Sequence, residues 1–268
     1  MGMTKIGIMG VAGFMGRMIA KQVHEHPKAV ISGGTVLQGS AEEGIEIATL
    51  CQLHGEAVKT VSDPRSVISA SDVVIDFTLP EVTVAHGRIA AECGTAFVAG
   101  TTGLTPEQEA DLAEVAKTIP LVYAPNMSLG VNLLFDLVKK VAAALDDDYD
   151  IEIVEMHHKR KIDAPSGTAL GFGKAAAAGR GVSLDEKGVL SREGITVARE
   201  QGQIGFATLR GGDVVGDHTV IFAGPNERIE LTHKAASRDI FAAGAVRAGI
   251  WAAGRKPGFY SMTDVLEI

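Results

Sequence analysis

The densest group of side chains that could do chemistry lies between positions 155 and 168. It contains five adjacent residues that can carry positive charge: His157, His158, Lys159, Arg160 and Lys161. Histidine titrates near neutral pH, and a lysine among other cations gives up its proton more easily, so both types suit proton transfer. The run leads into Pro165-Ser166-Gly167-Thr168, a helix start whose backbone N–H groups suit a carboxylate. The pattern predicts a pocket for a small dianion with a proton donor beside it.

Other interpretations of this stretch are weaker. Adjacent histidines without a cysteine or a further histidine at short spacing are a poor zinc ligand set, so we expect no metal. Ser166 lacks the G-x-S-x-G surroundings of a nucleophilic serine, and Cys51 and Cys93 lie far away in the first half of the chain. A basic surface loop is the simplest alternative, but the run leaves the end of a predicted strand, where side chains are held in place.

A second group of residues follows the first apolar run. Gly10, Gly13 and Gly16 have the spacing G-x-x-G-x-x-G, a variant of the dinucleotide-binding G-x-G-x-x-G, between a predicted strand and a predicted helix. Glycine allows the turn to be tight and the backbone to approach a pyrophosphate, whose charge the helix N-terminus stabilises. A tight turn without a ligand is the alternative. The predicted cofactor residues of this turn are Gly10, Val11, Ala12, Gly13, Phe14 and Met15.

The acidic residue that usually ends the second strand of such a domain is missing. Val36-Leu37-Gln38-Gly39 occupies its place, and Gln38 can hydrogen-bond a ribose hydroxyl. Since neither a carboxylate nor an arginine stands there to repel or attract a 2′-phosphate, the choice between NADH and NADPH stays open. Two further loops carry groups that suit a ribose or a carboxamide, with ordinary turn chemistry as the alternative. Their residues are Gly100, Thr101 and Thr102 in the first loop and Ala124, Pro125, Asn126 and Met127 in the second.

The elements that must position these residues change in type along the chain. Up to about residue 125, apolar runs at 5–9, 29–36, 72–77, 96–99 and 119–123 alternate with helical stretches at 13–24, 80–93 and after Thr105. This alternation predicts a Rossmann-type, doubly wound parallel sheet of the α/β class. Further along, helices at 131–145 and 167–179 and strands at 150–156 and within 204–234 predict a second, α+β domain. Tight turns between the last strands favour an antiparallel meander, so we expect a mixed, largely antiparallel sheet.

The composition limits the classes of partner. The 268 residues include 25 Lys+Arg and 33 Asp+Glu, and the net charge of −8 argues against a nucleic-acid-binding protein. No apolar run reaches the ~18 residues of a membrane span, and no secretory leader is apparent, so we expect a cytoplasmic protein without a membrane partner. Gly171, Gly173 and Gly244 fall inside predicted helices, where we expect close packing.

A dinucleotide site together with a cationic pocket that holds a proton donor predicts a reductase. Hydride addition to a conjugated imine leaves a negative charge that must be protonated, and a group with a pKa near the working pH does this best. Two alternatives remain at this point. One is a sensor that binds NAD(P) without turnover, and the other is a dehydrogenase acting on another small carboxylated imine.

Over essentially its whole length the chain resembles the 4-hydroxy-tetrahydrodipicolinate reductase (dihydrodipicolinate reductase) family. The resemblance implies NAD(P)H-dependent reduction of 4-hydroxy-tetrahydrodipicolinate to tetrahydrodipicolinate in the bacterial diaminopimelate and lysine pathway. It rests on the segments 10–16, 76–81, 100–103, 126–130, 155–168 and 205–210. The stretch from His157-His158 to Thr168 is the most specific of them.

The resemblance also implies residue roles and an assembly. The residue at His157 is the acid/base, and the one at Lys161 is a proton donor that contacts substrate. Those at His158, Gly167 and Thr168 hold the carboxylates of a small dicarboxylate, and we add Ser166 from its place at the helix start. The implied assembly is a homotetramer. The expected domains are a dinucleotide-binding domain, 1–127 completed by 239–268, and a substrate-binding and tetramerisation domain, 128–238.

Two departures from the family pattern bear on the cofactor. Many members have arginine where Phe14 stands, and an acidic residue, often followed by arginine, near Leu37-Gln38. Losing both removes charged contacts to the adenosine half of the cofactor and leaves the hydride chemistry untouched.

Overall fold

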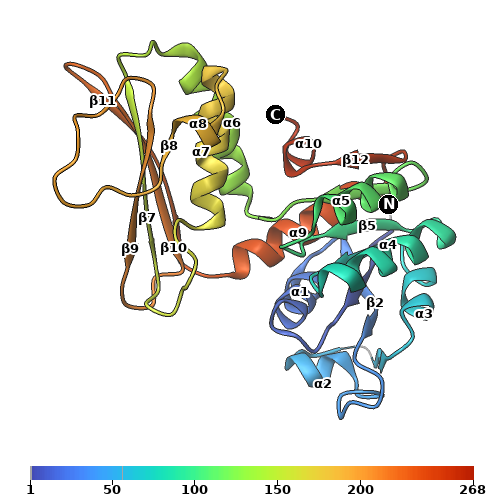
Figure 1. Cartoon of the computed structure of the whole chain (residues 1–268). Coiled ribbons are helices and arrows are strands. Elements are labelled where there is room, and N and C mark those ends of the chain that lie inside the picture. The colour runs from blue at the N-terminus through green and yellow to red at the C-terminus, as the bar shows by residue number, and fades with distance from the viewer. Residues whose placement is uncertain (1, 56) are drawn as a thin grey trace. The chain divides into compact units, whose positions relative to one another are not determined.

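The computed structural model describes residues 2–55 and 57–268 and divides into two compact units. The first unit comprises the chain up to Leu129 together with Asp239–Glu267, and the second comprises Gly130–Arg238 (Figure 1). Within the described residues, no helix combines the length and apolar character that crossing a membrane would require.

The first unit is built on a seven-stranded sheet in which every neighbouring pair is parallel. The strand order is β12-β6-β5-β4-β1-β2-β3. The strands are β1 (Thr4–Met9), β2 (Ala29–Thr35), β3 (Thr60–Val61), β4 (Val73–Asp76), β5 (Ala96–Ala99), β6 (Pro120–Tyr123) and β12 (Gly258–Tyr260). Every residue of β4 and β5 is buried, as expected for central strands covered on both faces. The predicted Rossmann-type sheet is confirmed.

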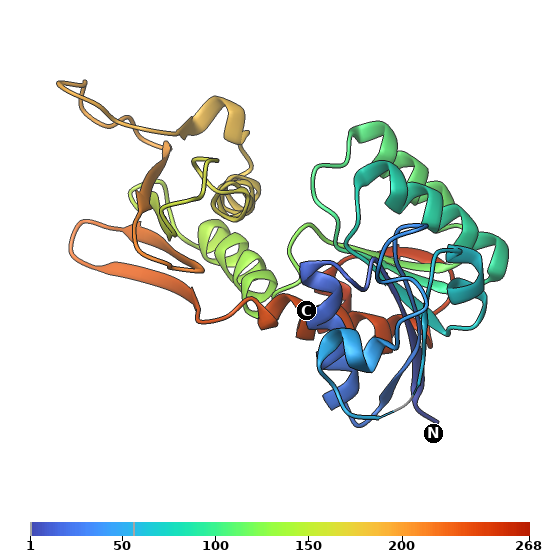
Figure 2. The same ribbon diagram turned by 90° about the horizontal axis from the view of Figure 1, so that it is seen from below.

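Helices cover both faces of this sheet (Figure 2). One apolar cluster joins the sheet to α1 and α9, and the other joins it to α3, α4 and α5. The helices of the unit are α1 (Phe14–Glu25), α2 (Ile47–Cys51), α3 (Pro64–Ser69), α4 (Pro80–Cys93), α5 (Pro106–Val115), α9 (Asp239–Ala252) and α10 (Met262–Leu266). Thr105 caps α5 in a capping box with Gln108, which explains why that helix starts where the sequence predicted.

The second unit contains a five-stranded mixed sheet in the order β11-β10-β7-β9-β8. Its strands are β7 (Asp150–His157), β8 (Gly188–Val189), β9 (Ile204–Arg210), β10 (Gly216–Ala223) and β11 (Arg228–Ala235), and its helices are α6 (Leu129–Ala144), α7 (Gly167–Arg180) and α8 (Leu184–Lys187). The mixed sheet confirms the expected class, but the meander was wrong. β7 lies between β9 and β10 and is parallel to β9, so only β10 and β11 form a hairpin.

Residues alternate strictly between the two faces of β7. Ile151, Ile153, Glu155 and His157 are buried, and the residues between them are partly exposed. The two isoleucines pack in the apolar cluster that α6 and α7 share with the sheet. Glu155 and His157 therefore extend the same face beyond the apolar core, beside the start of α7.

Candidate active site

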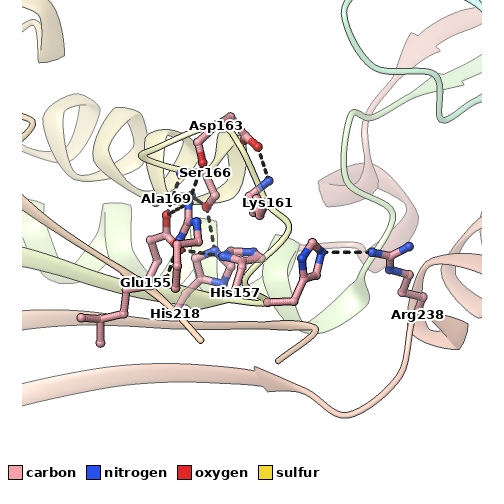
Figure 3. Close-up of polar contacts among 11 residues, drawn as sticks. Glu155, His157, Lys161, Asp163, Ser166, Ala169, His218 and Arg238 are labelled. Carbon is pink, nitrogen blue, oxygen red and sulfur yellow. Dashed lines mark hydrogen bonds and ion pairs between the residues drawn. The ribbon is translucent and has the colours of Figure 1, made fainter. Parts of the chain in front are cut away.

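Glu155 is the centre of the polar cluster in the second unit (Figure 3). Its side chain is 1% exposed, and its carboxylate accepts hydrogen bonds from four donors. Arg210 donates two of them at 2.7 and 2.9 Å, His157 Nδ1 donates one at 2.6 Å and the Ser166 N–H donates one at 3.0 Å. Burial raises the pKa of Glu155, but the bonds from Arg210, His157 and Ser166 outweigh it, so the net pKa is lowered. The carboxylate is therefore a fixed anion.

His157 is the last residue of β7 and is 8% exposed. Because an ionised carboxylate can only accept, the contact with Glu155 places a proton on Nδ1 of the ring. Nε2 is then the nitrogen left to give or take a proton, as in the histidines that a carboxylate orients in other enzymes.

His218 on β10 lies next to His157, with the ring centroids 5.0 Å apart in an edge-on arrangement. Burial, and second the nearby His157, lower the pKa of His218 to about 4. His218 is thus neutral at neutral pH, and its Nε2 lies 3.0 Å from Ser166 Oγ.

The start of α7 closes the cluster. Ser166 is the N-cap, and its Oγ accepts a hydrogen bond of 3.1 Å from the Ala169 N–H. The side chain of Ser166 is 2% exposed and already engaged with Ala169 and His218. Gly167, by contrast, is exposed in the first turn, next to Thr168. The structure thus brings the predicted helix start to the predicted histidine.

The remaining predicted residues lie at the edge of this cluster. Lys161 Nζ is 2.6 Å from Asp163 Oδ1, and the lysine side chain is about one-fifth exposed. His158 Nε2 is 3.4 Å from the guanidinium of Arg238. Loss of hydration, and then the charges of Arg160 and Arg238, lower the pKa of His158.

Sequence reasoning missed three members of the cluster: Glu155 as the partner of His157, Arg210 and His218. The first was visible, because the alternation of β7 places residues two apart on one face. Arg210 pairs with His157 in register on β9, and His218 pairs with Glu155 on β10. Neither pairing could be predicted from a meander.

A cavity of about 430 Å³ in the first unit opens at the glycine turn. Gly10 has φ +68°, which favours glycine, and a Cβ on Gly16 would lie 2.7 Å from Val11 Cα. Gly13 is the N-cap of α1 and places no side chain on the helix start. These features fit a dinucleotide pyrophosphate. The lining residues are Gly10, Ala12, Gly13, Val36, Leu37, Ser40, Glu42, Phe77, Thr78 and Leu79.

Some of the predicted cofactor residues line this cavity and others do not. Gly10, Ala12 and Gly13 line it, whereas Val11 is fully buried in the apolar cluster, Met15 packs against that cluster and Phe14 is 62% exposed. Gln38 is exposed and is not among the lining residues. Ser40 and Glu42 were missed, since the chain carries no motif at these positions and their direction depends on how the loop folds.

The two other predicted loops follow β5, which pairs with β4, and β6, which pairs with β5 on its other side. Thr101 is buried, and its Oγ1 lies 2.7 Å from Thr83 Oγ1, which donates at 3.1 Å to the buried Asp76. Gly100 lies against the ring of Phe77, which leaves no room for a Cβ.

In the second of these loops, Ala124 and Met127 are buried and Pro125 is exposed. Asn126 Oδ1 accepts a hydrogen bond of 2.9 Å from the Ser128 N–H. Both loops thus lie at the carboxyl edge of the sheet, where open α/β folds bind ligands.

Comparisons with known proteins identify both halves of the chain. The family model for the N-terminus of dihydrodipicolinate reductase matches residues 4–127, and the model for its C-terminus matches residues 130–266. The 4-hydroxy-tetrahydrodipicolinate reductase of Rhodopseudomonas palustris (strain BisB18) is 54% identical over 97% of this chain and 96% of its own. That of Chromohalobacter salexigens is 49% identical over 99% of each chain.

Solved structures show the same fold. The dipicolinate-bound dihydrodipicolinate reductase from Paenisporosarcina sp. TG-14 has a TM-score of 0.78 at 23% identity, covering 98% of both chains. An amine dehydrogenase from Mycobacterium smegmatis has a TM-score of 0.61 at 14% identity, with 97% of this chain and 95% of that chain covered. The matches to both family models and the identity over nearly the full length confirm the resemblance: the chain belongs to the dihydrodipicolinate reductase family.

Proposed function

We propose that His157, oriented by Glu155, and Lys161 carry out the proton chemistry of the family's reaction in this chain. As a member of the family, the chain is an oxidoreductase that reduces 4-hydroxy-tetrahydrodipicolinate to tetrahydrodipicolinate with NAD(P)H in diaminopimelate and lysine biosynthesis. We assign cofactor binding to the first unit and substrate binding to the second. The contact of 2.6 Å between His157 Nδ1 and the buried Glu155 carries the proposal.

The proton chemistry follows from the charges around the substrate. NAD(P)H, when bound, supplies the hydride, whose addition to the conjugated imine leaves an anion that takes up one proton. His157 can release a proton from Nε2, and Glu155 stabilises the imidazolium form by its charge. Lys161 can release a proton from Nζ, and its ion pair with Asp163 fixes the position of the ammonium group. We assign acid/base chemistry to His157, and proton donation with substrate contact to Lys161.

The two substrate carboxylates need donors and positive potential. The first-turn N–H groups of Gly167 and Thr168 supply both, because α7 is 14 residues long and its dipole is positive at this end. The Arg238 guanidinium can only donate, so His158 Nε2 accepts from it and the N–H of His158 is on Nδ1, which is buried without a partner among the described residues. We assign this N–H as a further donor to a substrate carboxylate. Ser166 contributes by capping this helix end through Ala169, so its place in the substrate site is indirect.

The cofactor occupies the cavity of the first unit in this proposal. The backbone at Gly10, Ala12 and Gly13 faces the cavity and can approach the pyrophosphate. The loops 100–102 and 124–127 contribute to the nicotinamide half through their place at the carboxyl edge of the sheet.

The test is cofactor oxidation by the purified protein with 4-hydroxy-tetrahydrodipicolinate. We expect oxidation of NADH, NADPH or both, and a loss of kcat in His157→Gln of about a hundredfold with unchanged cofactor affinity. Lys159→Gln is the matched control, because it removes an exposed neighbouring cation and leaves Glu155 and His157 untouched. Absence of oxidation with both cofactors would reject the function, and equal loss of kcat and cofactor affinity in His157→Gln would make this histidine structural.

We also propose that the chain forms a homotetramer in the cytoplasm. In the second unit, the face of the sheet turned away from α6 and α7 carries partly exposed Val154 and Met156 and the 49% exposed Leu209. This face of a substrate-domain sheet suits a second copy of the chain. We expect Leu209→Glu to lower the mass measured by sedimentation equilibrium; an unchanged mass would place the interface elsewhere.

A further inference from the structure

The loop after β2 brings a carboxylate into the cofactor cavity from a position outside the usual motif. Glu42 and Ser40 line the cavity together with the glycine turn, whereas Gln38, at the expected position, is exposed. We propose that Ser40 and Glu42 bind the adenosine ribose of the cofactor and that Glu42 selects NADH over NADPH. The inference rests on the proposed binding of the dinucleotide in this cavity.

Hydrogen bonds within the loop explain why Glu42 reaches the cavity. The Ser40 N–H donates to the Leu37 carbonyl at 3.1 Å, so the chain reverses directly after β2. The Glu43 carboxylate accepts a hydrogen bond of 2.7 Å from the Gly39 N–H, so the two sides of the turn are joined to each other. Glu43 is thereby engaged within the loop, while the neighbouring Glu42 lines the cavity.

The polar groups of the subsite match a ribose diol. Ser40 Oγ is buried and has no hydrogen-bond partner among the described residues, so it is an unused donor and acceptor. The Glu42 carboxylate can only accept, and ribose 2′- and 3′-hydroxyls are donors. A buried hydroxyl without a partner is costly, and a ligand that satisfies it recovers that free energy.

The same groups disfavour a 2′-phosphate. That phosphate carries between one and two negative charges and cannot satisfy the acceptor oxygens of Glu42. No lysine or arginine is among the lining residues to offset the repulsion. Arg17 lies in the first turn of α1 after the glycine turn, and its guanidinium donates to the carbonyl oxygens of Ala12 and Leu50. Glu42 thus faces the ribose without a cationic side chain beside it in the cavity.

The experiment measures the dissociation constants of NADH and NADPH by calorimetry, and kcat/KM for both, at low ionic strength. We expect the wild type to prefer NADH by about tenfold or more, since one charge pair in a half-exposed site contributes on the order of 1–2 kcal/mol. Glu42→Gln should bring the dissociation constants of NADH and NADPH closer together by at least about fivefold, mainly because NADPH binds more tightly. Ser40→Ala should weaken NADH about threefold to tenfold.

Glu43→Gln is the matched control, since it removes the same charge from the next residue. If Glu43→Gln disturbs the loop, it should weaken the binding of NADH and NADPH equally, so the ratio of their dissociation constants should stay unchanged. A wild type that binds NADPH as tightly as NADH, or a ratio that does not change in Glu42→Gln, would overturn the inference while leaving the proposed function intact. Binding of neither cofactor would instead reject the proposed function.

Discussion

Replacing Glu155 by glutamine tests the link between the buried carboxylate and the proposed acid/base role of His157. The substitution keeps the shape of the side chain but removes its charge and replaces one oxygen by an NH₂ donor. Oε2 accepts from His157 and from one Arg210 nitrogen, and Oε1 accepts from the other Arg210 nitrogen and from the Ser166 N–H. Whichever way the amide of the glutamine is turned, its NH₂ group therefore faces two of the four N–H donors and accepts from neither.

The size of the effect follows from these contacts. Hydrogen bonds to a charged group contribute roughly 1.5–3 kcal/mol each, and breaking a buried ion pair costs about 3–5 kcal/mol, so we expect a loss of about 4 kcal/mol in unfolding free energy. The imidazolium form of His157 also loses an anion with which it is in direct contact. At an effective dielectric constant near 20, this interaction is about 4 kcal/mol at 4 Å, and the Arg210 charge offsets part of it. We expect kcat to fall by about tenfold to a hundredfold, and by no more than in His157→Gln, because the carboxylate acts through that histidine.

The assay is kcat at a temperature where urea unfolding shows the variant to be fully folded. Glu152→Gln is the matched control. Glu152 lies on the opposite face of the same strand, and its carboxylate accepts from Arg192 at 2.9 Å and from Arg199 at 3.0 Å without touching a histidine. This control should lose stability and keep kcat within about twofold.

Two outcomes would refute the reasoning. If folded Glu155→Gln retained kcat within a factor of about three, the carboxylate would not orient a catalytic His157. If Glu152→Gln lost as much kcat as Glu155→Gln, the effect would come from general weakening of the sheet.

Two further predictions concern stability. The pKa of His218 is about 4 in the folded protein against 6.5 for an ordinary histidine. Between these two values the unfolded chain binds the proton more tightly than the folded protein does. The free energy of unfolding should therefore be unaffected by this group above pH 6.5 and fall by about 3 kcal/mol as the pH falls towards 4. Urea unfolding between pH 7.5 and 4.5 should show this loss in the wild type and much less of it in His218→Gln; parallel pH profiles would contradict it. Gly16→Ala should cost about 2–3 kcal/mol and weaken cofactor binding, because its Cβ would lie 2.7 Å from Val11 Cα, whereas Gly254→Ala, with no heavy atom within 4 Å, should be neutral in the same measurements.

Elements with strong local signals were predicted closely. β5 and α4 have the bounds that the sequence indicated, since a continuous apolar run and a proline-led helix ended by Gly94 are both local features. The two-residue β3 and the strand β12 were missed because each is defined by its pairing with a distant strand. The prediction that glycines inside helices mark close packing is confirmed: a Cβ on Gly171 would lie 2.7 Å from the ring of Phe135.

The same distinction holds for the sites. His157 and the helix start at Gly167 could be predicted because they lie in one continuous stretch of sequence. Arg210 reaches them because β9 pairs with β7. No turn joins these two strands directly, so the sequence does not indicate that they pair. Glu42 escaped prediction for another reason: the loop at Ser40 reverses direction through its own backbone hydrogen bonds, so the residue that enters the cavity is not the one that follows the strand.

The pairing of Glu155 with Arg210 also reconciles two opposing requirements of the proposed substrate pocket. A catalytic histidine gains from a buried carboxylate, but an uncompensated anion next to the pocket would repel a dicarboxylate. The bidentate Arg210 cancels that charge, so the set of Glu155, Arg210 and protonated His157 keeps a net charge of +1. In the proposed mechanism, Arg210 would therefore both hold Glu155 beside His157 and keep the pocket cationic towards the two carboxylates assigned to His158 and the start of α7.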